Sequence, residues 1–124
     1  NLMCYYWSQR KTLQESLTKA IEFVETHKTQ IPNFEVEINR LLSHKENYRP
    51  GKGYVLDTFW SAFECVNSSD TYEECVIKAI KMGFDTDTTA CVAGGLYALK
   101  ENVQIPQKWL NLLKKKEYVL SFLK

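Results

Sequence analysis

Apolar residues recur at intervals of three and four along most of this 124-residue chain, and this spacing restricts the fold more than any other feature. Residues three and four apart lie on one face of an α-helix, so the pattern is typical of helices that bury one side. The first such stretch follows Thr12 and Glu15, which have the spacing of a capping box. No segment alternates apolar and polar residues between hairpin turns. We therefore predict an all-α fold.

The same spacing predicts further helices after the first. Asp70 and Glu73 are expected to cap one of them, and Gly83 to end it. Gly94 and Gly95 lie inside the next, where each costs about 1 kcal/mol relative to alanine, so we expect a neighbouring backbone packed close to them. Pro106 is expected to open the last. The predicted helical segments are 34–42, 55–66, 71–82, 90–98 and 106–122, with a turn at 31–33 and a loop over SHKENYRPGKG.

The charge balance excludes functions that depend on a strong uniform field. The formal net charge is +1, so we expect no nucleic-acid partner and no attachment to an anionic membrane. The one dense basic cluster, Lys114–Lys116, is interpreted as solvated surface near a helix end. No apolar run approaches the roughly 20 residues of a membrane-spanning helix, and no signal peptide is apparent, so the chain is expected to be soluble.

The four cysteines form no C-x-x-C pair and no zinc-ligand spacing with histidine. Three of them fall within apolar helical patterns, and cysteine is often buried as a small core residue. We interpret them as core residues in a reducing compartment and expect the protein to be cytoplasmic. The cysteines are Cys4, Cys65, Cys75 and Cys91.

The segment GFDTDTTACVAGG places two carboxylates and several hydroxyls just before a helix of small residues. At about 5 Å and an effective dielectric near 20, Asp85 and Asp87 would repel each other by about 3 kcal/mol. A helix N-terminus returns only about 0.3–1 kcal/mol per anion, so if the pair is shielded from solvent a divalent cation would close this gap. With the Thr88 hydroxyl, the ligands are hard oxygens that suit Mg2+, Mn2+ or Ca2+, of which we favour Mg2+.

Closely spaced acids before a helix also occur in calcium-binding loops and in ordinary helix caps. An EF-hand is excluded because, counting from Asp85, position 6 is Ala90 rather than glycine and position 12 is Leu96 rather than glutamate. The helix cap stays open as an alternative, since an Asp-x-Asp-Thr sequence can be an N-cap with an acidic first turn on a solvated surface.

Four segments are more informative about function together than any one of them is alone. In order along the chain they are GKGYVLDTFWSAF, TYEECVIKAIKMG, GFDTDTTACVAGGLYAL and IPQKW. In order and spacing they resemble the C-terminal part of the ADP-ribosylglycohydrolase family, over about residues 51–113. The resemblance implies the C-terminal portion of an orthogonal helical bundle. It also implies a hydrolase that cleaves the glycosidic bond between ADP-ribose and an acceptor, so that the partner is an ADP-ribosylated substrate.

The resemblance further implies a two-metal Mg2+ centre, in which Mn2+ is an alternative. The family's metal ligands fall on Asp85, Asp87 and Thr88, and its substrate-binding loop falls on Gly51, Gly53 and Tyr54. Glycines there would let the backbone approach the ligand, and Tyr54 could pack against a ribose or base, or be an ordinary loop aromatic. No catalytic base can be identified from the sequence.

The sequence departs from the family at one point. Complete members carry a second acidic motif of the T-D-D-T kind near the N-terminus, and this chain has no adjacent Asp-Asp pair. We expect the chain to be a single or partial domain, with helical residues 1–50, the family-matching segment 51–113 and a terminal helix at 114–124. It would be a fragment, one piece of a split enzyme with the N-terminal half as a separate chain, or a degenerate relative.

A non-catalytic helical binding or structural module derived from the same fold remains the alternative function.

The other residues whose side chains could carry chemistry are assigned structural roles. His27 and His44 lie in polar segments and are expected at the surface. Asp57 is interpreted as an acidic residue in a first helical turn and Thr58 as a filler. Trp7, Trp60 and Trp109 are expected in the core, with an adenine-pocket role left open for Trp7.

Overall fold

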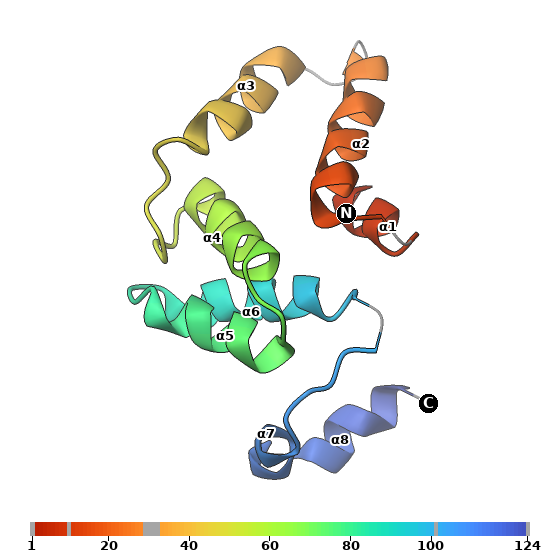
Figure 1. Cartoon of the computed structure of the whole chain (residues 1–124), viewed down its shortest axis with the longest axis vertical. Helices are drawn as coiled ribbons and strands as arrows, with labels where there is room; N and C mark the ends of the chain where they lie inside the picture. Colours follow the sequence, from red (N-terminus) through yellow and green to blue (C-terminus); the bar gives the residue numbers. More distant parts are fainter. Residues whose placement is uncertain (1, 10, 29–32, 101, 124) are drawn as a thin grey trace.

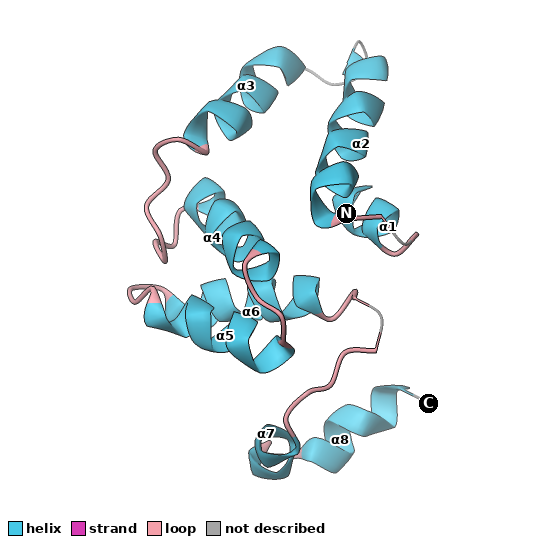
Figure 2. Ribbon diagram, viewed as in Figure 1, coloured by secondary structure: helices cyan, strands magenta, loops and turns pink. Residues whose placement is uncertain are grey.

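The computed structural model describes residues 2–9, 11–28, 33–100 and 102–123, and over these ranges it contains helices and loops without a strand (Figures 1 and 2). The all-α prediction is therefore confirmed. The elements are α1 (Leu2–Trp7), α2 (Leu13–Thr26), α3 (Phe34–His44), α4 (Val55–Asn67), α5 (Tyr72–Lys81), α6 (Thr86–Tyr97), α7 (Gln107–Leu112), α8 (Lys116–Leu120) and a 3-10 helix at Ser121–Leu123.

Helices α4, α5 and α6 form the centre of the molecule. Figure 1 shows α5 and α6 side by side with α4 crossing them, and all three pairs are in contact. Cys65 and Val66 of α4, Cys75 of α5 and Ala93 of α6 are almost completely buried between these helices. Small and medium side chains at these positions allow the helix axes to approach closely, which fixes where the N-terminus of α6 lies.

The N-terminal helices extend the same core. Helix α1 packs against α2, and Met3, Trp7, Leu13 and Leu17 join the cluster of buried side chains. The capping box predicted at Thr12 is present, with both of its reciprocal hydrogen bonds. The core position expected for Trp7 is confirmed by its burial. Local signals in the sequence therefore place the start of α2 correctly.

A hydrogen bond from a buried tryptophan of α4 connects α3 to the central helices. Trp60 of α4 is 3% exposed, and its indole N–H donates a 2.9 Å hydrogen bond to the carbonyl oxygen of Leu41. The turn predicted at 31–33 lies outside the described residues, apart from Asn33, whose φ of 56° precedes the start of α3. The chain then leaves α3 and returns to α4 through the loop predicted over SHKENYRPGKG (Figure 2).

Two predicted helix starts are wrong by one residue. Thr71, rather than Asp70, is the N-cap of α5, and its side chain accepts a hydrogen bond from the amide of Glu74. The amide of Asp70 instead donates to the Glu74 carboxylate, so the hydrogen bonds at this helix start use Thr71 and Glu74 rather than Asp70 and Glu73, and they do not form a complete capping box. Pro106 is the N-cap of α7, not its first residue. Gly83, with φ of 78°, follows the end of α5 as predicted.

Three further expectations about packing need correction. Gly94 faces side chains rather than a backbone, since a Cβ there would lie 3.0 Å from the Tyr72 hydroxyl, and Gly95 has nothing within 4 Å. Cys91 is exposed, unlike Cys65 and Cys75. Trp109 is only half-buried, with its ring edge-on to Tyr72. The amphipathic pattern is weak in these segments, so it could not assign their faces.

The C-terminal helical region is divided, because Lys115 adopts a left-handed conformation with φ of 57° between α7 and α8. In Figure 1 these two helices lie beyond α5 and α6. Several large apolar side chains of this region are exposed, among them Leu112 of α7 and Phe122 of the 3-10 helix. Within the described part of the chain, no helix is both long and apolar enough to cross a membrane.

Candidate metal centre and its loop

The three predicted metal ligands lie at the N-terminal end of α6. Asp85 is the N-cap, and Asp87 and Thr88 are in the first turn. The Thr88 hydroxyl, and next the side chain of Asp87, lower the pKa of Asp85 below its usual value, so these polar groups lie close to its carboxylate. The Asp85 side chain makes no N-cap hydrogen bond of ordinary geometry. The backbone amide of Thr88 also lowers this pKa, so the alternative of a helix cap stays open.

The first glycine of the predicted substrate loop is bonded to this helix end. The amide of Asp85 donates a 2.9 Å hydrogen bond to the carbonyl oxygen of Gly51. The amide of Gly51 in turn donates to the Ser61 hydroxyl of α4 at 3.0 Å. Gly51 has φ of +74°, and a Cβ there would lie 2.6 Å from the carbonyl oxygen of Gly83. Both conformation and space require glycine at this position.

The second glycine lies directly beside the Asp85 carboxylate. A Cβ on Gly53 would be 2.4 Å from Oδ2 of Asp85, so any side chain at this position would displace the carboxylate. The site thus offers two carboxylates and a hydroxyl beside a backbone segment without a side chain. Two carboxylates and a hydroxyl are hard oxygens of the kind that a hard divalent cation prefers.

The rim of the site carries aromatic side chains and one cation. Tyr54 is 47% exposed, and Phe84, at φ of 56° between Gly83 and Asp85, is 71% exposed. The ammonium of Lys52 lies 3.6 Å from the centre of the Phe84 ring. Sequence reasoning missed Phe84 and Lys52. The available signal for Phe84 was its place between a glycine and a helix N-cap. A residue there lies outside both helices, so its ring is not expected to pack in the interface between them.

Asp57 lies in the first turn of α4 as predicted, but it is buried and paired with His44, which is half-buried rather than free at the surface. Asp57 is only 4% exposed, and its Oδ1 atom lies 2.7 Å from Nε2 of His44 and 2.7 Å from the amide nitrogen of Arg49. Burial alone would raise the pKa of Asp57, but the hydrogen bonds from Arg49 and His44 and their positive charges more than offset it, so the pKa is lowered. His44 is in contact with Asp57 across the loop, which no local sequence pattern indicates.

Thr58 also has a defined partner. Its hydroxyl donates to the carbonyl oxygen of Lys52 at 3.2 Å, so the prediction of a filler is wrong. Three side chains from the first two turns of α4 therefore bind the backbone of the preceding loop, at Arg49, Gly51 and Lys52. They are Asp57, Thr58 and Ser61.

The donor set is small, and one buried hydroxyl lies beside it. Among the described residues no group of three or more His, Cys, Asp or Glu side chains could hold a metal ion. The two carboxylates at Asp85 and Asp87, with Thr88, are thus what this part of the chain supplies. Thr89 follows in the same turn, is completely buried, and its hydroxyl has no hydrogen-bond partner among the residues that the structure describes.

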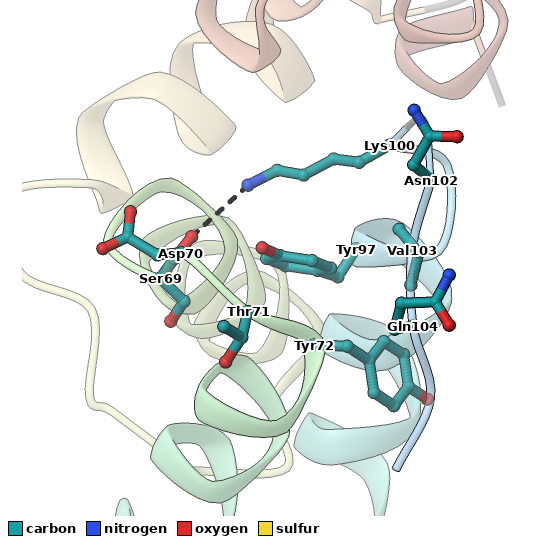
Figure 3. A pocket seen from close by; sticks show the side chains of 9 residues that line it. All are labelled: Ser69, Asp70, Thr71, Tyr72, Tyr97, Lys100, Asn102, Val103 and Gln104. Carbon is teal, nitrogen blue, oxygen red and sulfur yellow. Dashed lines mark hydrogen bonds between the residues drawn. The ribbon is translucent and has the colours of Figure 1, made fainter. Parts of the chain in front are cut away.

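A separate cavity of about 380 Å³ lies at the other end of α6. Figure 3 shows Tyr97 and Tyr72 in its wall, with Lys100 reaching across to donate a 3.4 Å hydrogen bond to the carbonyl oxygen of Ser69. Helix α6 has 12 residues, so this cavity is about 18 Å from the carboxylates at the N-terminal end. It is therefore not part of the candidate metal centre.

Comparison with known proteins extends the resemblance over nearly the whole chain. The family model described as ADP-ribosylglycohydrolase matches residues 2–124. The ADP-ribosyl-[dinitrogen reductase] glycohydrolase of Rhodospirillum rubrum is 34% identical over 84 residues, which cover 62% of this chain and 29% of that protein. The ADP-ribosylarginine hydrolase Tri1 of Serratia proteamaculans is 34% identical over 71 residues, or 54% of this chain and 19% of that protein. The matched part thus spans less than a third of either relative, and no solved structure matches.

Proposed function

Because the chain belongs to the ADP-ribosylglycohydrolase family, we propose that it supplies part of the active site of a Mg2+-dependent hydrolase. The bond cleaved would be the glycosidic bond between ADP-ribose and its acceptor. The observation that carries the proposal is the approach of Gly53 to the Asp85 carboxylate, where a Cβ would lie 2.4 Å from Oδ2. A site that binds both a metal and a substrate needs acidic oxygens beside backbone that no side chain covers, as at Gly53.

Asp85, Asp87 and Thr88 would hold the cation, with Mn2+ as an alternative to Mg2+. A bound Mg2+ would supply Lewis-acid stabilisation of the charge that develops as the glycosidic bond breaks. The residues themselves provide the anionic charge, and the pKa of Asp85 is lowered, first by the Thr88 hydroxyl, which favours its ionised form. Octahedral Mg2+ takes about six ligands, so water and other protein groups would complete the shell.

The Gly51–Tyr54 loop would bind the ADP-ribose. Its backbone is fixed by Asp85 on one side and by Ser61 and Thr58 of α4 on the other. A ligand could approach the main chain closely at Gly53, and the exposed ring of Tyr54 offers a surface on which a ribose or base can pack. Holding the loop rigidly reduces the entropy lost on binding.

The remaining metal ligands are proposed to come from residues outside 1–124, on the same polypeptide or on a separate chain. The relatives are more than three times longer than the segments matched in them. An apolar groove of about 350 Å³ also lies open between α1, α2, α3 and α4, which is the kind of surface that another helix would cover. Its lining includes Leu17, Ile21, Val24, Ile38 and Phe59.

A non-catalytic module that binds a nucleotide or a protein partner is the second candidate. It is favoured by the small donor set, since two carboxylates and a hydroxyl are fewer groups than a two-metal hydrolase uses. In that case the loop would bind ADP-ribose without turnover. The two candidates share the ligand and differ in the reaction.

The proposal is tested with the protein expressed from its complete natural reading frame. Calorimetric titrations with Mg2+ and ADP-ribose, and an assay of Mg2+-dependent ADP-ribose release, are run on wild type, Asp87→Ala and the control Asp70→Ala. Asp70 is an exposed acid before α5. We expect Asp87→Ala to lose release and to weaken Mg2+ binding at least about tenfold, with Asp70→Ala unchanged. Unchanged release in Asp87→Ala would contradict the proposal, and binding without release in wild type would favour the non-catalytic module.

A further inference from the structure

Asp57 is a buried carboxylate whose hydrogen bonds all lead away from its own helix. It is the third residue of α4, yet its Oδ1 accepts from His44 of α3 and from the Arg49 amide in the loop. A carboxylate that is 4% exposed is costly unless such donors are present. The acid therefore fixes two groups at once: the start of the loop and the imidazole of His44.

The fixed imidazole contacts the exposed aromatic residue of the loop. The rings of His44 and Tyr54 are 5.6 Å apart at an angle of 75°, an edge-to-face arrangement. Because Asp57 holds Nε2 of His44, the orientation of the imidazole plane is set, and so is the surface against which Tyr54 packs. Tyr54 directly follows Gly53, whose backbone lies beside Asp85.

We propose that His44, oriented by Asp57, is a positioning residue that holds the Tyr54 ring in the orientation in which it packs against the ribose or base of ADP-ribose. This role rests on the proposed function of the site. His44 acts through Tyr54 and does not take part in bond cleavage. Its contribution is to binding of the nucleotide part of the ligand, and the cation is bound independently of it.

The test is a double-mutant cycle at His44 and Tyr54, read by ADP-ribose affinity in the presence of Mg2+. The variants are His44→Gln, Tyr54→Ala and the double variant, in the protein from its complete reading frame. Glutamine can still donate to Asp57 but has no aromatic ring. His27→Gln is the matched control, because His27 is bonded to a backbone carbonyl in its own helix region, far along the chain from the loop.

His44→Gln is expected to weaken ADP-ribose binding about two- to tenfold, with Mg2+ affinity and melting temperature close to wild type. In the Tyr54→Ala background the same substitution should have no further effect on binding. If His44 has only a structural role, His44→Gln will weaken ADP-ribose binding by the same factor in both backgrounds, and that result would overturn the inference. Unchanged binding in His44→Gln would overturn it as well.

A replacement variant and the binding of ADP-ribose by wild type separate failure of this inference from failure of the proposed function. If His44→Gln does not fold, Asp57→Asn replaces it in the cycle, since an asparagine oxygen can still accept from the Arg49 amide. Normal ADP-ribose binding in wild type with additive variants overturns only the role of His44. Failure of wild type to bind ADP-ribose overturns the proposed function together with this inference.

Discussion

The amide of Asp85 donates a 2.9 Å hydrogen bond to the carbonyl oxygen of Gly51, and this contact joins the acidic motif to the glycine loop. The two residues are far apart in the sequence, and both atoms belong to the main chain. The position of the loop over the N-terminus of α6 is therefore set by this backbone contact, and the side chains of Asp57, Thr58 and Ser61 hold the loop from α4. Five predictions test this arrangement and its surroundings.

Gly53→Ala should damage the candidate metal centre without unfolding the protein. The new Cβ would lie 2.4 Å from Oδ2 of Asp85, so the carboxylate must move. We expect Mg2+ affinity to fall about ten- to a hundredfold, the range found when a group that orients a metal ligand is changed. Calorimetry with Mg2+ measures the effect, and Gly95→Ala, where nothing lies within 4 Å, is the control. Equal affinities in the two variants would be evidence against a cation at Asp85.

Gly94 and Gly95 should respond differently to alanine. Gly95→Ala should raise the free energy of unfolding by about 0.5–1 kcal/mol, because alanine favours the helix and space is available. In Gly94→Ala the Cβ would lie 3.0 Å from the Tyr72 hydroxyl, and we expect this gain to be lost. Urea denaturation of Gly94→Ala in a Tyr72→Phe background should recover it. A Gly94→Ala variant as stable as Gly95→Ala would show that the helices separate freely.

Thr89→Val should stabilise the protein. The Thr89 side chain is completely buried and its hydroxyl has no partner, whereas valine has a similar shape without the polar group. Removing an unsatisfied buried hydroxyl is expected to add about 1 kcal/mol to the free energy of unfolding. Chemical denaturation measures this difference. A loss of stability would instead mean that the hydroxyl is satisfied in solution, for example by a water molecule.

The stability contributed by Asp57 should depend on pH. Burial opposes ionisation, but the Arg49 amide and His44 lower the pKa of Asp57 below its unfolded value of about 3.9. Its contribution is therefore fully present above about pH 4 and is lost as the pH falls through the folded value. Urea denaturation from pH 3 to 7 should show wild type more stable than Asp57→Asn near neutrality, with the difference shrinking toward about pH 3. A difference independent of pH would contradict this assignment.

The cysteines should differ in their reactivity with a thiol reagent. Burial raises the pKa of both Cys65 and Cys75 to about 11, so little thiolate is present at pH 8 and access is blocked. Cys91 is exposed on α6. Iodoacetamide followed by mass spectrometry should label Cys91 in the folded protein and reach Cys65 and Cys75 only after denaturation. Labelling of all three at the same rate would place the α4–α6 core in doubt.

Features encoded in a few consecutive residues were predictable from the sequence. The helical periods and the box at Thr12 are examples, and both are confirmed. The start of α5 was ambiguous because Asp70 with Glu73 and Thr71 with Glu74 have the same spacing, and tertiary geometry decides between them. The exposure of Cys91 was missed because α6 is built from small residues without a strong apolar face.

The candidate site likewise has a part that the sequence predicted and a part that only the fold shows. Asp85, Asp87 and Thr88 are neighbours in one motif, so their proximity followed from the helix start, and their role as metal ligands stays a prediction. His44 meets Asp57 through a loop whose path is set by hydrogen bonds from the amides of Arg49 and Gly51 to side chains of α4. No residue pattern encodes such a path, and the pair could be found only from the fold.

The order of α4, α5 and α6 along the chain also bears on how the molecule assembles. The three helices are consecutive, and short turns join α4 to α5 and α5 to α6, whereas α4 meets α6 over a longer separation along the chain. Contacts across a short turn lose little loop entropy when they form. We therefore expect α5 and the acidic start of α6 to associate before the glycine loop, which lies much further back along the chain, docks on them.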